Sequence, residues 1–325
     1  MPSPSAALNG FRPDLGTMFE FDNEMNQRGF IATQVAPVFE SAVQAGTFGK
    51  IPLKELLKEP EVGRNSRGEY NRTNFTFKDE TFGTKEYGIE IPIDDRQSRI
   101  YRDFFDHEVV CARQALAIVM RKAEKRMADA IFNTTTWTGS ALTTAVTNEW
   151  DDASNATPVA DVEAAVRKVW DATGVWPNAL IINRHVFRNL RFCDEVTDKI
   201  HSDGAGRSIE PSQITPAILA SVFDLPRIII AGSARNSANE GQNASIANIW
   251  SNEYAMVARV AETGGIEEPC LARTIHWSED GSEIGGTFET YYTDETRGNV
   301  VRCRHEVQEL VLYTAMGHLL SNITT

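Results

Sequence analysis

The residues whose types and spacing could support catalysis or metal binding are few in this sequence. His107-Glu108-Val109-Val110-Cys111 comes close to the zinc-protease pattern, in which two ligands one helical turn apart hold a metal beside a glutamate base. The fifth position is a cysteine, and no third ligand is evident. We interpret this run as the surface of a helix and expect no metal site there.

The other candidate groups are equally incomplete. His305-Glu306 and Glu309 fall in an alternating strand, which spreads the side chains along the strand instead of focusing them on one point. Gly204-Ala205-Gly206 follows a charged run, not a buried strand, and lacks the third glycine of a dinucleotide loop. The acid pairs Asp94-Asp95 and Asp151-Asp152 are interpreted as solvated turn residues. The sequence therefore predicts no catalytic residues, no cofactor and no enzyme activity.

The chain is long enough for one large core or two smaller ones, and it is strongly acidic. It has 325 residues, 42% of them hydrophobic, and a formal net charge of −13. Such a surface repels phosphate, which works against tight electrostatic binding to nucleic acid. We expect DNA to lie alongside this protein by non-specific proximity only.

Cysteine usage and the first residues bear on the compartment. The cysteines are isolated from one another, without a CxxC pair: Cys111, Cys193, Cys270 and Cys303. This pattern favours buried thiols in a reducing compartment over a disulfide scaffold. The run MPSPSAALNG has no basic n-region or apolar h-region, and no window approaches 18 apolar residues. We therefore expect a protein made in the cytosol that does not enter a membrane.

One stretch, residues 101–133, is expected to organise the rest of the chain. Its apolar residues step by three or four, as one buried face of a helix requires, and no glycine or proline interrupts them. They are Phe105, Val109, Ala112, Leu116, Val119, Ala123, Met127 and Ile131. At about 1.5 Å per residue the helix would span roughly 45–50 Å and could serve as a spine. An ordinary long helix of an α/β enzyme or a two-stranded coiled coil has the same periodicity.

Two segments before this stretch cannot form a stable core by themselves. Residues 1–46 are polar, with short apolar clusters at 18–21 and 35–39, and indicate an extended arm that is either disordered or held by another surface. Residues 47–98 contain a polar run at 61–72, followed by stretches that alternate with period two at 73–78 and 87–94, which indicates a long two-stranded hairpin. A lone hairpin is marginal in water. It therefore either folds back on its own domain or lies across a neighbouring subunit.

The rest of the chain predicts a compact α/β domain followed by antiparallel strands. Helix and strand patterns alternate after a polar, threonine-rich bridge, with Gly174 in the usual position after a helix. The predicted elements are a helix from 158 to 173, a strand at 179–182 with a second helix after it, a helix at 212–223, and strands at 228–231, 247–250 and 254–260. Alternation returns from residue 270 onward, which predicts strands that come back to pack against the spine.

This order of segments, together with three motifs, resembles the major capsid proteins of tailed bacteriophages, which have the Hong Kong 97 type fold. The run from Val162 through Gly174-Val175-Trp176-Pro177-Asn178 to Leu180-Ile181-Ile182 is similar to the family's helix, G-x-x-P-N turn and buried strand. Residues 220–225 followed by 228–232 are similar to its L-F-x-x-P helix and next strand, and 249–252 match a third element. The resemblance spans residues 20–320 and depends on the order of these motifs.

The resemblance implies an α+β, Hong Kong 97-like capsid fold. Its implied parts are an N-terminal arm at 1–46, an extended E-loop hairpin at 47–98, a P-domain spine helix and bridge at 99–149, an α/β A-domain at 150–268, and returning P-domain strands with a C-terminal segment at 269–325. Contacts between subunits would run through the arm and the E-loop, where alternating charges fix register more than they add affinity. The candidate contact residues are Phe19, Phe39, Arg64, Arg67, Arg72, Lys78 and Lys85.

The resemblance also implies a function. The protein would be a structural capsid protein that self-assembles into pentamers and hexamers of an icosahedral shell enclosing double-stranded DNA. It would reside in the virion, and in the host cytoplasm during assembly, with a scaffolding protein, a portal and decoration proteins as partners. An encapsulin-like compartment or gene transfer agent shell is the alternative within this fold, and an α/β enzyme of unknown reaction is the alternative outside it.

Two features depart from the family pattern. The sequence has no long helical amino-terminal segment that could act as a built-in scaffold, so scaffolding would be a separate protein or the terminus would be processed. Some members cross-link an E-loop lysine to an asparagine of a neighbour. Lys78 and Lys85 are the candidates here, but the sequence identifies no partner for them.

Overall fold

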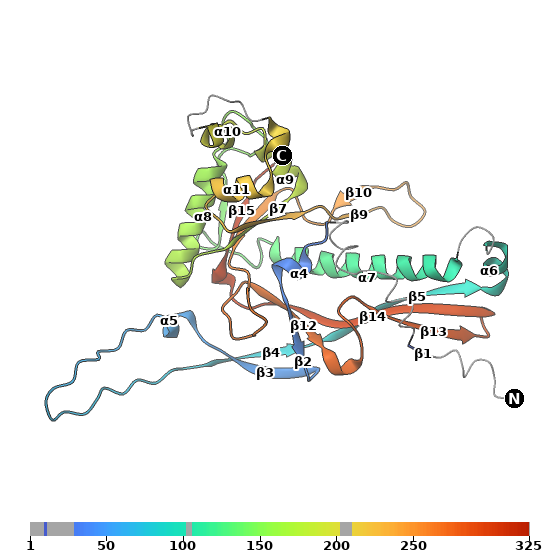
Figure 1. The fold of residues 1–325 in the computed structure, drawn as a ribbon, viewed down its shortest axis with the longest axis horizontal. Helices are drawn as coiled ribbons and strands as arrows, with labels where there is room; N and C mark the ends of the chain where they lie inside the picture. The colour runs from blue at the N-terminus through green and yellow to red at the C-terminus, as the bar shows by residue number, and fades with distance from the viewer. Residues whose placement is uncertain (1–9, 12–28, 102–105, 202–209, 325) are drawn as a thin grey trace.

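The computed structural model describes residues 10–11, 29–101, 106–201 and 210–324. The chain forms two units that lie against each other, and a long loop projects from the first unit (Figure 1). The first unit is a long helix packed on a six-stranded sheet, and the second is a five-stranded sheet covered by helices. The mixture of helices and sheets is the α+β class predicted above.

The first unit is built around strand β14, which pairs along both of its edges. Residues 298–307 of β14 pair with β5, while β13 and β12 pair antiparallel with successive parts of the other edge. Strands β1 and β2 complete the sheet beside β13 and β12. The bounds are β1 Gly10–Phe11, β2 Val38–Ser41, β5 Lys85–Asp94, β12 Ala272–Trp277, β13 Thr287–Thr293 and β14 Gly298–Val311.

The expected spine is helix α7, which spans His107–Ile131 and lies across this sheet (Figure 1). It is shorter than predicted, 25 residues or about 37 Å, because Asp106 caps its first turn by accepting hydrogen bonds from the backbone N–H groups of Glu108 and Val109. A separate helix, α6 Asp95–Tyr101, precedes it, and Phe105 lies outside the described residues. The predicted apolar face is buried, at Ala112, Leu116, Val119, Met127 and Ile131.

The second unit contains the predicted α/β elements in the order expected from the sequence. Helix α8 ends at Gly174, whose φ of 69° is the left-handed conformation that favours glycine, and the next strand is buried along its whole length. The helices are α8 Pro158–Thr173, α9 Arg184–Leu190, α10 Asp194–His201 and α11 Pro216–Val222. The strands, in sheet order, are β6 Thr143–Ala145, β15 Gly317–Ser321, β11 Tyr254–Ala258, β7 Ala179–Asn183 and β8 Arg227–Ala231.

Three predictions for this region need correction. The expected helix at 212–223 is split into a 3-10 turn, Pro211–Gln213, and α11, because Thr215 caps α11 and Pro216 occupies its first position. The last strand, β15, was expected to return to the spine. It instead joins the second sheet between β6 and β11, so the end of the chain ties the two units together. The expected strand at 247–250 is the shorter β10 Ile246–Asn248, which pairs with β9 Ala234–Asn236.

The predicted arm at 1–46 is only partly described, and its last part was assigned wrongly. Phe30, Val35 and Ala36 are buried in the core of the first unit, around the short helix α4 Ala32–Val35, and β2 is a strand of its sheet. Residues 30–41 therefore belong to the body of the protein. Phe19 lies outside the described residues.

Candidate inter-subunit surface

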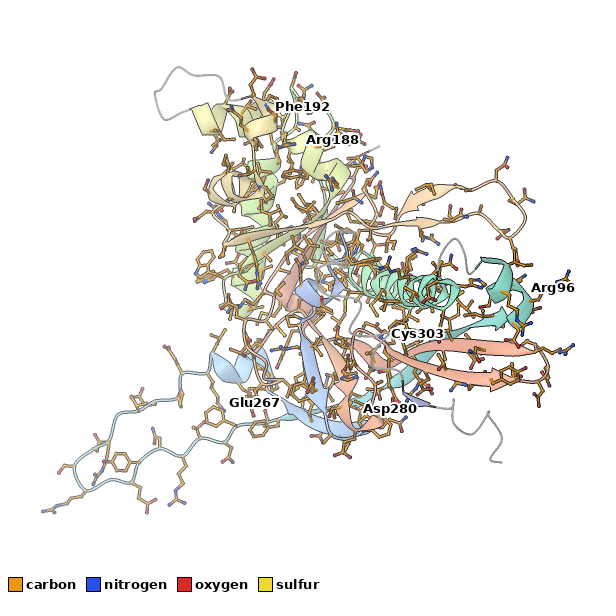
Figure 2. The ribbon with its side chains drawn as sticks, turned by 45° about the vertical axis from the view of Figure 1, so that its right-hand side comes forward. Arg96, Arg188, Phe192, Glu267, Asp280 and Cys303 are labelled. Carbon is orange, nitrogen blue, oxygen red and sulfur yellow. The ribbon has the colours of Figure 1, made fainter. Side chains whose placement is uncertain are left out.

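The most exposed described part of the chain is the loop that leaves the first unit after β3 Ala45–Lys50 and returns in β4 Lys78–Gly83 (Figure 1). Apart from the short helix α5 Leu53–Leu56, it has no regular structure. Every residue from 57 to 79 except Gly68 is exposed. We call residues 57–77 the projecting loop. Figure 2 shows its side chains pointing into solvent on both sides of the trace.

The hydrogen bonds of the projecting loop close on its own backbone. Arg64 Nε donates to the carbonyl of Gly68 at 2.7 Å, and Lys58 Nζ donates to the carbonyl of Asn74 at 3.1 Å. The Asn71 side-chain amide likewise donates to a backbone carbonyl of the loop, that of Glu61, at 2.8 Å. These bonds shape the loop, but they do not dock it on the body.

The root of the loop, in contrast, is held by buried polar groups. Strands β3 and β4 pair from Ala45↔Gly83 to Lys50↔Lys78. The buried carboxylate of Glu306, on β14, accepts hydrogen bonds from Gln44 Nε2 and Thr84 Oγ1, both at 2.8 Å. Because this carboxylate joins β14 to the chain beside both strands of the root, it fixes the direction in which the loop leaves the body.

A second set of contacts holds the root from its other side. Lys50 Nζ lies 3.0 Å from Glu80 Oε2, donates to the carbonyl of Leu312, and sits 4.5 Å from the ring centre of Tyr313. Tyr313 in turn donates its hydroxyl hydrogen to the carbonyl of Ile51 at 2.9 Å. The loop therefore extends from a rigid base.

The projecting loop exposes large apolar side chains that a monomer has no reason to display. Val62 is 85% exposed, Tyr70 70%, Phe75 62% and Phe77 65%. Large exposed apolar surfaces mark interaction sites on soluble proteins. The loop has both the reach and the chemistry of a segment that packs on another molecule.

The predicted hairpin has different strands from those expected. Residues 73–77 alternate in sequence but pair with no strand in the structure, and β4 begins only at Lys78. The second predicted strand, at 87–94, is real, but it is β5 and pairs with β14 in the body. The hairpin at the loop root is thus formed by β3 and β4.

The structure places the candidate contact residues in three settings. Arg64, Arg67 and Arg72 are all exposed on the projecting loop. The Arg64 guanidinium lies 4.7 Å from the ring centre of Tyr70, and Arg67 has a φ of 69° in a tight turn. Arg72 lies 3.7 Å from Glu69 in a pair whose side chains are 88% and 90% exposed, so this pair contributes little in the monomer.

The remaining candidates do not share this surface. Lys78 is exposed at the first position of β4, opposite Lys50, and Lys85 is exposed at the first position of β5, opposite Val307. Phe39 is half-buried in β2 opposite Ile275, which makes it part of the body sheet.

Sequence reasoning missed Glu124, which is fully buried in the middle of α7. Its Oε1 accepts hydrogen bonds from Ile31 N at 2.8 Å and from Trp250 Nε1 at 2.5 Å, and its Oε2 accepts one from Ala32 N at 2.8 Å. Burial raises the pKa of this carboxyl, although the hydrogen bonds oppose the rise. One side chain therefore joins the spine, the amino-terminal segment and the second unit. An acid flanked three and four residues away by Met120, Met127 and Ala128 was the available signal.

The groups considered for chemistry have structural contacts instead. On β14, Glu306 faces the loop root and Glu309 pairs with Arg126 of α7 at 2.8 Å, so the two carboxylates serve different contacts. Within the described ranges, no group of three or more His, Cys, Asp or Glu side chains is placed to hold a metal ion. Among the same residues, no helix has both the length and the apolar character that crossing a membrane requires.

Comparison with known proteins gives relatives of low identity that cover most of the chain. No protein-family model matches the sequence. The major capsid protein of Pseudomonas phage JBD67 is 23% identical over 296 residues, which are 90% of this chain and 91% of that protein. The major capsid protein of Burkholderia phage BcepMu is 22% identical over 303 residues, with the same coverage of both chains.

Solved structures show the same architecture. A phage-related protein from Bordetella bronchiseptica aligns with a TM-score of 0.68 at 15% identity, over 97% of this chain and 98% of its own. The capsid protein of cyanophage P-SCSP1u aligns with a TM-score of 0.54 at 12% identity, over 88% and 86% of the two chains. The chain has the Hong Kong 97 type capsid fold, and the resemblance to major capsid proteins of tailed phages is confirmed. It is a structural protein of the capsid-shell class.

Proposed function

We propose that this protein is the major capsid protein of a tailed phage, and that it assembles into the pentamers and hexamers of an icosahedral shell enclosing double-stranded DNA. The projecting loop is the observation that carries this proposal. It combines a rigid root with an extended stretch on which large apolar residues, such as Tyr70, Phe75 and Phe77, are 62–70% exposed in the monomer. Its role is structural, without catalysis.

The shape of the chain favours head-to-tail association. A loop on one side of a subunit must bind a different surface of the next subunit, and such heterologous contacts close into rings when the rotation between copies allows it. The loop would then act as the E-loop. Helix α7 and the first sheet would act as the P-domain, and the second unit as the A-domain.

The charge of the protein suits a container for DNA. A net charge of −13 repels the phosphate backbone, so packaged DNA would be confined by the shell without binding tightly to it. The further partners proposed are a scaffolding protein, a portal and decoration proteins. The location proposed is the virion, after assembly in the host cytoplasm.

Deletion of residues 62–72 tests the proposal. These residues are exposed except for Gly68 and lie at the far end of the projecting loop, so the deletion should leave the circular dichroism spectrum and the melting temperature of the subunit unchanged. It should abolish shells in negative-stain microscopy and sedimentation, whereas the wild type forms pentamers, hexamers or shells with its scaffold. A wild type that stays monomeric or dimeric under all assembly conditions would contradict the function. A deletion that unfolds the subunit would show that the loop belongs to its own core.

A matched variant distinguishes the effect of the loop's length from the effect of its aromatic side chains. Replacing Tyr70, Phe75 and Phe77 with serine keeps the loop length but removes its large aromatic groups. We expect this variant to fold normally and to assemble poorly, because aromatic side chains in protein interfaces account for much of the binding energy.

A microbial compartment is the second candidate, because an encapsulin from Synechococcus elongatus shares the fold with a TM-score of 0.52 over 91% of this chain at 12% identity. The contents of purified shells distinguish the two functions. Nuclease-protected DNA supports a phage or transfer-agent shell, and a packed enzyme supports a compartment.

A further inference from the structure

A stacked pair of tryptophans lies on the surface of the second unit, beside the root of the projecting loop. The rings of Trp170 and Trp176 are 5.5 Å apart at an interplanar angle of 28°, and the side chains are 43% and 58% exposed. Among the six tryptophans of the chain, all of them described, these two are the most exposed, and Trp277 is half-buried. Trp137, Trp150 and Trp250 are fully buried.

The local sequence fixes the pair in place. Trp170 belongs to the last turn of α8, and its carbonyl accepts the hydrogen bond from Gly174 N, at 2.7 Å, that ends the helix. The left-handed Gly174 then turns the chain so that Trp176 folds back over Trp170. Because both ends of this turn are held by a regular helix and a buried strand, the aromatic surface is preorganised.

The pair is continuous with the projecting loop. A Cβ at Gly174 would lie 3.0 Å from Leu57 Cδ2, so the first residue of the loop touches the turn that carries the tryptophans. Leu57 itself is 57% exposed. Figure 1 shows the carboxyl end of α8 directly beside α5, on the side of the molecule from which the loop leaves.

The exposed area is too small to be an interface by itself. A tryptophan buries about 150–250 Å² when covered, so the pair at its present exposure offers roughly 200 Å². A stable protein interface needs about 800 Å² from each partner. The adjoining projecting loop can supply the remainder without a gap.

We infer that Trp170 and Trp176 form the fixed anchor of the inter-subunit contact. One neighbouring copy of this chain binds the projecting loop and also covers the tryptophan pair. This inference rests on the proposed function and names residues of that contact outside the loop. The loop supplies reach, while the pair supplies a rigid aromatic centre of the kind found at interaction hot spots.

Two double variants test the inference. Trp170→Gln with Trp176→Gln removes the aromatic surface, and Trp170→Phe with Trp176→Phe is the matched control that keeps it. Both should retain the wild-type circular dichroism spectrum and melting temperature. The glutamine variant should lose about tenfold or more in shell yield at equal protein concentration, and the phenylalanine variant should stay within about twofold of the wild type. A glutamine variant that assembles like the wild type would overturn the inference.

Acrylamide quenching of tryptophan fluorescence gives a second readout. In wild-type shells the quenchable fraction should fall toward that of the phenylalanine variant, because a neighbour covers the pair. If shells form and quenching remains as in free subunits, the pair lies outside the contact and the inference fails while the proposed function stands. If the wild type forms no shells, the proposed function fails and the inference falls with it.

Discussion

Arg126 on α7 and Glu309 on β14 form an ion pair across the helix–sheet interface, with 2.8 Å between Nη2 and Oε1. The Arg126 guanidinium also lies 3.7 Å from the ring centre of Tyr87 on β5. The side chains of the pair are only 24% and 10% exposed. One arginine thus connects the spine to two neighbouring strands, which fixes how the helix sits on its sheet.

The first prediction concerns this pair. Arg126→Leu leaves the Glu309 carboxylate largely buried without its partner, and we expect the free energy of unfolding to fall by about 2 kcal/mol. Lys122→Leu, at an exposed position of the same helix, is the matched control and should change it by about 0.5 kcal/mol or less. Urea denaturation of the unassembled subunit measures both. Equal effects of the two substitutions would show that the ion pair does not stabilise the fold.

The second prediction concerns Glu124. In Glu124→Gln, one end of the side chain becomes an NH2 group that faces an N–H donor, because Ile31, Ala32 and Trp250 all donate to this carboxylate. The lost acceptor should lower the free energy of unfolding by about 2–3 kcal/mol. Asp129→Asn, whose parent side chain is 60% exposed on the same helix, is the control and should have little effect.

The effect of Glu124→Gln on stability should also depend on pH. Burial raises the pKa of Glu124 in the folded state, so the folded protein binds this proton at a higher pH than the unfolded chain does. The corresponding stability is present at low pH and is lost as the pH rises through the folded-state pKa. The difference in unfolding free energy between the wild type and Glu124→Gln should therefore narrow with rising pH. A difference that widens would contradict the raised pKa.

The long helices were predictable from the sequence because their information is local. The apolar residues of α7 and α8 repeat every three or four positions, and Gly174 marks the end of α8 directly. Strand partners were harder. The alternation at 87–94 predicts a strand, but nothing within it shows that its partner is β14, some two hundred residues later, instead of a neighbour in a hairpin. The insertion of β15 between β6 and β11 is non-local in the same way.

In the candidate surface, too, the local features were predictable from the sequence and the long-range contacts were not. The polar, glycine-containing run at 61–72 predicted an exposed loop, and residues 61–72 are indeed exposed except for Gly68. The root contacts made by Lys50 and Glu306 join residues far apart in the chain, so no local pattern shows them. The exposure of Trp170 and Trp176 was equally hard to predict, since tryptophan is highly buried on average.

The third prediction is a loss of stability in mild acid through His318. This buried histidine lies between the carbonyl of Ala141, 3.1 Å from Nδ1, and Thr144 Oγ1, 2.9 Å from Nε2. Burial lowers its pKa to about 4, and the nearby Lys168 adds to the effect. Because the unfolded chain takes up this proton near pH 6.5 and the folded chain does not, stability should fall as the pH drops between the two values. The loss from this group should reach about 2 kcal/mol by about pH 5.

Substitution of the histidine checks this account. His318→Gln should be less stable than the wild type at neutral pH, and its stability should depend less on pH between about 7 and 5. Burial also lowers the pKa of His305 to about 4. This histidine remains in the variant, so part of the pH dependence of stability remains as well. Urea titrations at several pH values give the comparison, and parallel curves for the two proteins would rule out His318 as a source of acid sensitivity.

The fourth prediction concerns the rigid root of the projecting loop. Lys50→Met keeps the length of the side chain but removes the ion pair with Glu80 and leaves the carbonyl of Leu312 without this donor. We expect a modest loss in the free energy of unfolding, about 1 kcal/mol, because the pair is partly exposed. The larger effect should be local. Hydrogen exchange of the β3 and β4 amides should accelerate, while the amides of β5 and β14 keep their protection.

Shell assembly by Lys50→Met shows whether the rigid root matters for function. A loop that swings about a loosened root samples more directions, so binding a neighbour would cost more conformational entropy, and shell yield should fall although every residue of the loop tip is unchanged. Lys54→Met, on the exposed side of α5, is the matched control and should assemble normally. If Lys50→Met speeds exchange in β3 and β4 yet assembles as well as the control, then the rigidity of the root is a property of the fold and not a requirement of the contact.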